Sequence, residues 1–291
     1  MSDLPLAPAL AGPHRPFAIG MRPIDAGEWI VPGDDLAPVL AERAALFGEQ
    51  LGAVFRDEPA SLAAQAELWD LLAGHLTGGF PGTWRRDGTA VLGPGVRADA
   101  GEEPPLLAAA RLVADDLVLM MRGPEGWRLA AGAVCFPSHW RLADKAGLAF
   151  ADVHAPVHGF GPGSAGAGQV ATIFDRMPPG RVAERGNWSV AGTGALHLPP
   201  GTPESDAVWL RAERQTLRKL PESGAVAFTI RVTTLPAEAL AARADGAAVA
   251  ARLLAQLRAM RAEERAYKGL AGARLARVEG TLEAIAAPAG G

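Results

Sequence analysis

The chain has 291 residues, of which 28 are basic and 32 acidic, giving a formal net charge of −4. This near balance gives no electrostatic reason to expect nucleic acid or an anionic membrane as a partner. The single cysteine excludes an internal disulfide and a four-cysteine metal site within one chain. No run approaches the roughly 20 apolar residues of a membrane-spanning helix, and the start lacks a signal-peptide pattern, so we expect a cytoplasmic protein.

The N-terminal part predicts an extended segment followed by helices. Residues 1–35 are rich in proline and glycine and predict extended chain on the surface. Apolar side chains then recur at helical spacing in two successive stretches, the second preceded by Ser61 as the expected N-cap. We expect a helical layer, residues 36–80, at the start of one domain that spans residues 36–285.

Short β-like runs separated by glycine and proline begin near residue 88. The clearest is "AVAFTIRVTT", in which Phe228 and Ile230 point one way and Thr229 points the other. Pro221 and Gly224 precede it and predict a turn, and therefore a hairpin with "RAERQTLRKL".

The last part of the chain, residues 236–270, is helical by composition and is interrupted near Gly246. The final "APAGG" is expected to be disordered. The order of helices, then a mostly antiparallel sheet, then helices predicts an α+β fold.

Reactive side chains concentrate in one stretch, "CFPSHWRLADKAGLAFADVHAPVHGF", residues 135–160. After a buried strand end, we expect a short helix that packs Trp140, Ala143 and Leu148 inward, and then an apolar loop. An imidazole in such a loop has a lowered pKa and stays neutral, which is the state that a metal or heme ligand needs. From the residues alone, a hydrogen-bonded core histidine remains the alternative.

Two sequence patterns suggest a binding site, but the residues around them do not support it. "GPGSAG", residues 161–166, matches a dinucleotide-binding pattern, but no buried strand leads into it and no acidic residue follows about 20 positions later. We expect a loop there. The histidines of the 135–160 stretch do not form a zinc-binding set, because no further ligand falls at a matching spacing.

Several separated segments resemble the heme-dependent oxidative N-demethylase family over roughly residues 16–270. They are "FAIGMRPIDAGEWI", "VCFPSHWRLADKAG", "VHAPVHGF", "RGNWSV", "LRAERQTLRKLPESGAVAFTIRV" and "YKGL". The resemblance implies a PAS-like fold, an antiparallel sheet with flanking helices that encloses one heme b. Family members oxidise a small secondary amine such as dimethylamine with O2, as monooxygenases, and release a primary amine and formaldehyde.

The resemblance also implies a separate electron donor. With one cysteine and no nucleotide-binding fingerprint, the chain cannot hold its own iron–sulfur cluster or flavin reductase module. Electrons would therefore come from an external NADPH-linked flavin or iron–sulfur reductase.

By resemblance, His154 is the expected axial ligand of the iron. His158 stands where the family is expected to have proline, so it is either a second histidine near the heme or a surface substitution. His139 also departs from the family pattern, where arginine is usual. Cys135 is the rival ligand, but its apolar strand lacks the cations that a thiolate needs, which favours a buried core thiol.

The remaining expected roles concern charge in the pocket. The heme propionates need cations, and the candidates are Arg141, Lys145, Arg211, Arg214 and Arg218. A cationic dialkylammonium substrate needs a carboxylate that can also take its proton, for which Glu213 is the first candidate and Asp152 the second. Asn187 is expected to donate a hydrogen bond to oxygen, and Trp188 to form a wall.

Two alternatives to the enzyme stay open. The first is a non-catalytic heme-binding PAS-type sensor that binds a gas without turnover. The second is a homologue that has lost heme, in which the histidines only fill the core.

Overall fold

The computed structural model of the protein describes residues 19–287, and a seven-stranded antiparallel sheet lies at its centre. In spatial order, its strands are β1 (Arg22–Ile24), β8 (Val182–Ala191), β9 (Trp209–Lys219), β10 (Val226–Pro236), β6 (Asp116–Gly123), β7 (Gly126–Ala133) and β2 (Phe55–Asp57). A separate three-stranded sheet contains β3 (Arg85–Asp87), β4 (Ala90–Gly93) and β5 (Val96–Ala98). The expected α+β class is confirmed.

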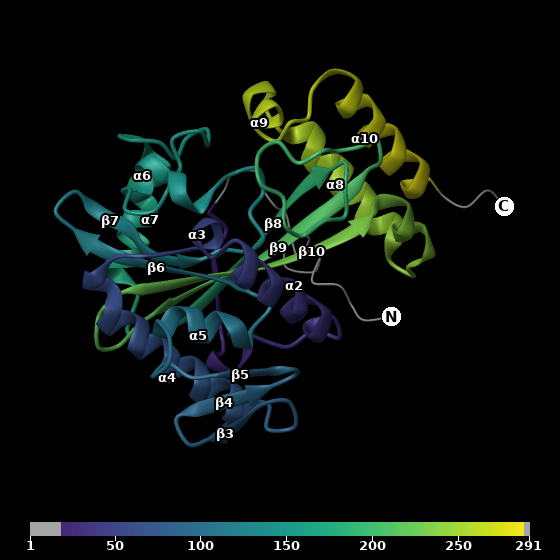
Figure 1. Ribbon diagram of the computed structural model, residues 1–291. Helices are drawn as coiled ribbons and strands as arrows, with labels where there is room; N and C mark the ends of the chain where they lie inside the picture. The colour runs from purple at the N-terminus through teal and green to yellow at the C-terminus, as the bar shows by residue number, and fades with distance from the viewer. Residues whose placement is uncertain (1–18, 288–291) are drawn as a thin grey trace.

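The two predicted N-terminal helices are present and cover one face of the large sheet (Figure 1). The layer comprises α2 (Leu36–Glu49), the single turn α3 (Leu51–Val54), α4 (Leu62–Gly79) and, from later in the chain, α5 (Pro105–Leu112). Ser61 stands at the expected N-cap position of α4, but without a side-chain cap bond. Its hydroxyl donates to the carbonyl oxygen of Glu58 at 2.6 Å and makes no cap bond to the first turn of α4.

Strand β6 is buried on both faces, which places apolar cores on either side of the sheet. Leu117 and Leu119 pack with the helices of the N-terminal layer. Val118 and Met120 alternate with them and pack on the opposite face. The sheet therefore separates a core beneath the N-terminal helices from a second space on its other side.

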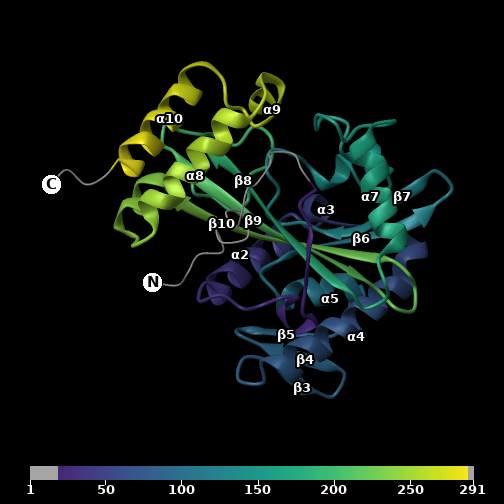
Figure 2. The same ribbon diagram turned by 180° about the vertical axis from the view of Figure 1, so that it is seen from behind.

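That second face is covered by the turn α6 (Phe150–Val153) and by α7 (Ala165–Arg176), which Figure 2 shows in front of the sheet. Val170 and Phe174 are the buried contacts of α7 to the core on this side of the sheet. The loop expected at residues 161–166 ends in Ser164, whose hydroxyl accepts from the backbone N–H of Ala167 and so caps α7.

The short helix expected after Trp140 is reduced to one 3-10 turn, Leu142–Asp144. Trp140 packs against the core as predicted, whereas Ala143 and Leu148 are exposed and Leu142 is buried in their place. The reason is backbone pairing with β7: the N–H of Leu129 donates to the carbonyl of Leu148, which holds the chain extended there.

The C-terminal half confirms the hairpin and the helical end. β9 and β10 pair along their whole length, and the connecting turn ends at Gly224, whose φ of +66° favours glycine. The predicted interruption at Gly246 is where α8 (Gly246–Ala259) begins. It is followed by α9 (Ala262–Tyr267) and α10 (Gly272–Ala286), and α10 extends the helical region beyond the predicted limit.

In the described range, 19–287, no helix combines the length and the apolar character needed to cross a membrane. The expectation that "APAGG" is disordered falls almost wholly outside these residues.

Candidate functional site

A cavity of about 670 Å³ lies on the α6–α7 side of the large sheet. Its walls come from strands β6 to β10, from α6 and α7, from the segment after β7, and from the region of α9. Much of the lining is apolar, including Val118, Met120, Phe150, Phe174 and Phe228. An enclosed apolar space with a few convergent polar groups is typical of a small-molecule or cofactor site.

His154 lines this cavity at the C-terminal end of α6. Its Nδ1 lies 2.9 Å from the carbonyl oxygen of Phe150, and the imidazole stacks on the Phe150 ring with centroids 4.1 Å apart. A carbonyl only accepts, so Nδ1 carries the proton. Burial lowers the pKa of His154 to about 4, so the ring is neutral at pH 7 and Nε2 keeps its lone pair.

Glu213 projects into the cavity from β9, and three side chains fix its carboxylate. Gln215 and Asn187 donate to Oε2 at 2.7 and 3.1 Å, and Ser138 Oγ lies 3.3 Å from Oε1. Asn187 faces Glu213 from the neighbouring strand β8, where the two residues are direct cross-strand partners. The structure thus brings together two of the three expected catalytic residues.

Two cationic side chains that the sequence reasoning missed also line the cavity, Arg185 on β8 and Lys268 after α9. The Nε of Arg185 is buried and has no hydrogen-bond partner among residues 19–287, and burial lowers the pKa of this guanidinium. Lys268 Nζ donates to the carbonyl of Trp188 at 2.6 Å, and burial lowers its pKa to about 8. Strand alternation with Asn187 was the available signal for Arg185.

Trp188 lines the cavity but belongs mainly to another core. Its indole N–H donates to Gln256 Oε1 of α8 at 2.6 Å, and its side chain is buried among residues of α8 and α10. Arg211 also lines the cavity, yet its donors are engaged by Ser138 and by backbone carbonyl oxygens. Trp188 and Arg211 therefore stabilise the cavity wall through contacts with other groups of the protein.

His139 stands at the rim of the cavity with a half-exposed side chain. Its Nε2 lies 3.4 Å from Glu204 Oε1, and Arg274 reaches Glu204 Oε2 at 3.0 Å. His139 adopts a φ of 59°, which is unusual for a residue other than glycine. His139, Glu204 and Arg274 thus form a cluster at the rim of the cavity, and each comes from a separate segment of the chain.

Other expected site residues do not line the cavity. Asp152, His158 and Arg141 are exposed. Arg214 and Arg218 project from the opposite face of β9, as their alternation with Glu213 requires. Arg214 pairs with Glu184, and Arg218 lies over the Trp29 ring at 4.3 Å. Their expected contact with a ligand in this cavity does not fit these positions.

Cys135 is fully buried in the segment that follows β7 and lies outside the cavity lining. Burial raises the pKa of its thiol to about 12. The side chain is therefore an unreactive thiol in the core, as the apolar strand around it predicts.

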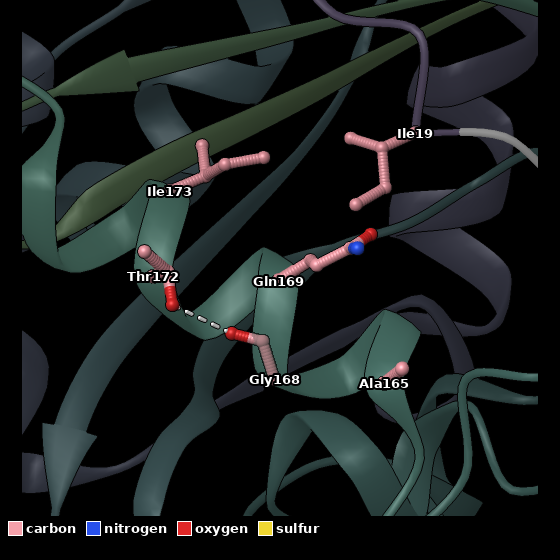
Figure 3. Close-up of a pocket in the computed structure, with 6 residues that line it drawn as sticks. All are labelled: Ile19, Ala165, Gly168, Gln169, Thr172 and Ile173. Carbon is pink, nitrogen blue, oxygen red and sulfur yellow. Dashed lines mark hydrogen bonds between the residues drawn. The ribbon is translucent and has the colours of Figure 1, made fainter.

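A second hollow, of about 530 Å³, lies along the outer side of α7 (Figure 3). It is lined by Ile19, Ala165, Gly168, Gln169, Thr172 and Ile173. Figure 3 shows Thr172 donating within the helix to the carbonyl of Gly168, at 2.9 Å. None of these side chains is titratable, so the groups that can bind or transfer protons lie in the larger cavity.

No group of three or more His, Cys, Asp or Glu within residues 19–287 is arranged to hold a metal ion.

The fold and the cavity define an α+β protein with a largely apolar site that contains a neutral histidine and a few polar groups. The family described as haem-dependent oxidative N-demethylase, alpha subunit-like, matches residues 20–276. The chain belongs to this family, which confirms the resemblance read from the sequence. A comparison with curated proteins found no match.

Proposed function

We propose that this protein is a heme-b monooxygenase that removes a methyl group from a small secondary amine such as dimethylamine. The balanced reaction joins the amine, O2, two electrons and two protons to give a primary amine, formaldehyde and water. The observation that carries the proposal is His154, a neutral imidazole with a free Nε2 at the wall of a large, mostly apolar cavity. Membership of a haem-dependent demethylase family supports it.

The cavity residues fit a heme in two respects. His154 offers an unprotonated nitrogen, and His ligation through one face is a common arrangement for heme iron. Arg185 offers a buried Nε that no group in the described part of the chain accepts from, and a buried donor of this kind is costly unless a ligand satisfies it. We assign Arg185 and Lys145 to the propionates in place of Arg141, Arg214 and Arg218, because both line the cavity.

The proposed roles of the protein's own residues follow from their contacts. Glu213 binds the substrate ammonium and accepts its N–H proton, while Asn187 and Gln215 hold the carboxylate in place. The apolar wall keeps water away from these groups, which strengthens their charge interactions. A bound heme supplies iron that activates O2 with electrons from outside.

A separate NADPH-linked reductase supplies those electrons in this proposal. The printed family name describes an alpha subunit, which supports a partner protein. His158, which was a candidate to occupy the second face of the iron, is exposed and outside the cavity lining. His158 is therefore not among the residues that would hold a heme in this cavity.

The first test is the absorption spectrum after expression with added hemin. Wild-type protein should bind heme with a Soret band, and His154→Ala should lose most of it because the iron ligand is gone. His158→Ala is the matched control from the same loop and should retain heme. A colourless wild type, or full heme content in His154→Ala, would overturn the assignment.

Formaldehyde release then separates the enzyme from the sensor. Heme-loaded protein with dimethylamine, O2 and a surrogate reductant should release formaldehyde. Heme binding without formaldehyde across a panel of small methylamines would support the sensor instead.

A further inference from the structure

The two oxygens of the Glu213 carboxylate are unequally occupied. Oε2 accepts hydrogen bonds from both Gln215 and Asn187, at 2.7 and 3.1 Å. Oε1 has one longer contact, 3.3 Å to the hydroxyl of Ser138. Each carboxylate oxygen has two lone-pair positions, so among the contacts of residues 19–287 Oε2 is fully used whereas Oε1 retains capacity for a further donor.

The direction of the Ser138 hydroxyl is set by Arg211. Arg211 Nε donates to Ser138 Oγ at 2.8 Å, and a guanidinium can only donate. The Ser138 oxygen is therefore the acceptor in that bond, and its own proton is left for Glu213 Oε1. Arg211 is held in turn, since its Nη2 donates to the carbonyls of Phe136 and Leu196 at 2.7 and 2.9 Å.

We infer that Ser138, fixed by Arg211, is a positioning residue for Glu213, and that Oε1 is the atom that accepts the N–H of a bound methylammonium ion. The inference rests on the proposed function and deepens it. It also defines the substrate class: the ligand must carry an N–H, so protonated secondary and tertiary methylamines bind and quaternary ammonium ions bind weakly.

The test compares heme-loaded variants by calorimetric Kd for dimethylammonium together with kcat and KM. Ser138→Ala should weaken the Kd about tenfold and raise KM similarly, because Oε1 loses its orienting donor. Ser138→Thr keeps a hydroxyl and should restore binding. Thr172→Ala is the control: it also removes a hydroxyl, but Thr172 lies outside the lining of this cavity, on the outer side of α7, where its hydroxyl donates to the carbonyl of Gly168 at 2.9 Å.

A double variant separates positioning from general structural damage. If Ser138 acts only through Glu213, Ser138→Ala should add no further loss of amine binding in a Glu213→Gln background. Wild type should also bind dimethylammonium at least tenfold more tightly than tetramethylammonium, and Glu213→Gln should reduce that preference.

The outcomes distinguish this inference from the proposed function. Formaldehyde release by wild type, combined with an unchanged Kd in Ser138→Ala, would refute the inference and leave the function standing. A wild type that binds neither heme nor amine would refute both. Should Ser138→Ala not fold, Ser138→Cys replaces it, since a thiol is a weak donor, and equal binding by the Thr and Cys variants would count against the inference.

Discussion

His154 illustrates how the surroundings of one side chain set its chemistry. The backbone carbonyl of Phe150 fixes the proton on Nδ1, and the Phe150 ring covers one side of the imidazole. Burial disfavours the charged form, so the pKa falls to about 4. The same burial that prepares Nε2 for a ligand makes the heme-free protein sensitive to acid.

The acid sensitivity can be measured. The folded-state pKa of His154 lies below the unfolded value of about 6.5, so the unfolded chain binds the proton more readily. The contribution of His154 is fully present above pH 6.5 and is lost as the pH falls toward 4. Between pH 7 and pH 5, heme-free wild type should lose about 2 kcal/mol more unfolding free energy than His154→Ala. Equal losses in urea denaturation would contradict this.

At the scale of elements, strand β9 separates two kinds of polar side chain by alternation alone. Glu213 and Gln215 enter the cavity, whereas Arg214 on the other face pairs with Glu184. The sequence predicts this division from the period of two. It does not say which face holds the cavity, because both faces of the sheet are covered by helices.

The start of α8 depends on the absence of a side chain at Gly246. A Cβ there would lie 1.7 Å from the carbonyl oxygen of Leu240, in the turn before the helix. Gly246→Ala should therefore lower the unfolding free energy by about 2 kcal/mol or more, since backbone must shift.

The matched control for that prediction is Gly280→Ala in α10. Within residues 19–287, and apart from the adjoining backbone of α10 itself, no atom lies within 4 Å of a Cβ built at Gly280. The change should be neutral or stabilising by up to about 1 kcal/mol, as alanine favours helix over glycine. Thermal unfolding of the two variants tests the steric explanation, and a similar change in stability in both would contradict it.

At the scale of the whole molecule, one buried ion pair joins the N-terminal helices to the sheet. Arg43 of α2 donates to Asp116 of β6 at 2.8 Å, and both side chains are almost completely buried. Asp116 also accepts the backbone N–H groups of Cys135 and Phe136. The carboxylate thereby connects a helix, a strand and the segment that leads to Ser138.

Removing the cation should leave a buried charge without its ion partner. Arg43→Met is expected to cost about 3–5 kcal/mol of unfolding free energy, measured by chemical denaturation. Arg258→Met breaks an exposed pair with Glu283 and should have a much smaller effect. Comparable losses in the two variants would show that burial of the pair is unimportant.

The sequence by itself determined the α+β class, the β9–β10 hairpin, the two first helices and the family. Periodicity and turn residues are local signals, so they can be read without knowledge of distant contacts. Local signals gave a wrong prediction after Trp140, because the carbonyl of Leu148 accepts a hydrogen bond from the backbone N–H of Leu129. This pairing holds the chain extended where a helix was expected.

Only the tertiary structure decided which polar groups share the cavity. Glu213, Ser138 and Lys268 are far apart in the chain and meet because strand pairing and the C-terminal helices bring them to one face. For the same reason the arginines expected beside the heme were misplaced and Arg185 was missed. Charge and spacing identify candidates, but the side of a sheet on which a cavity forms depends on how the covering helices pack.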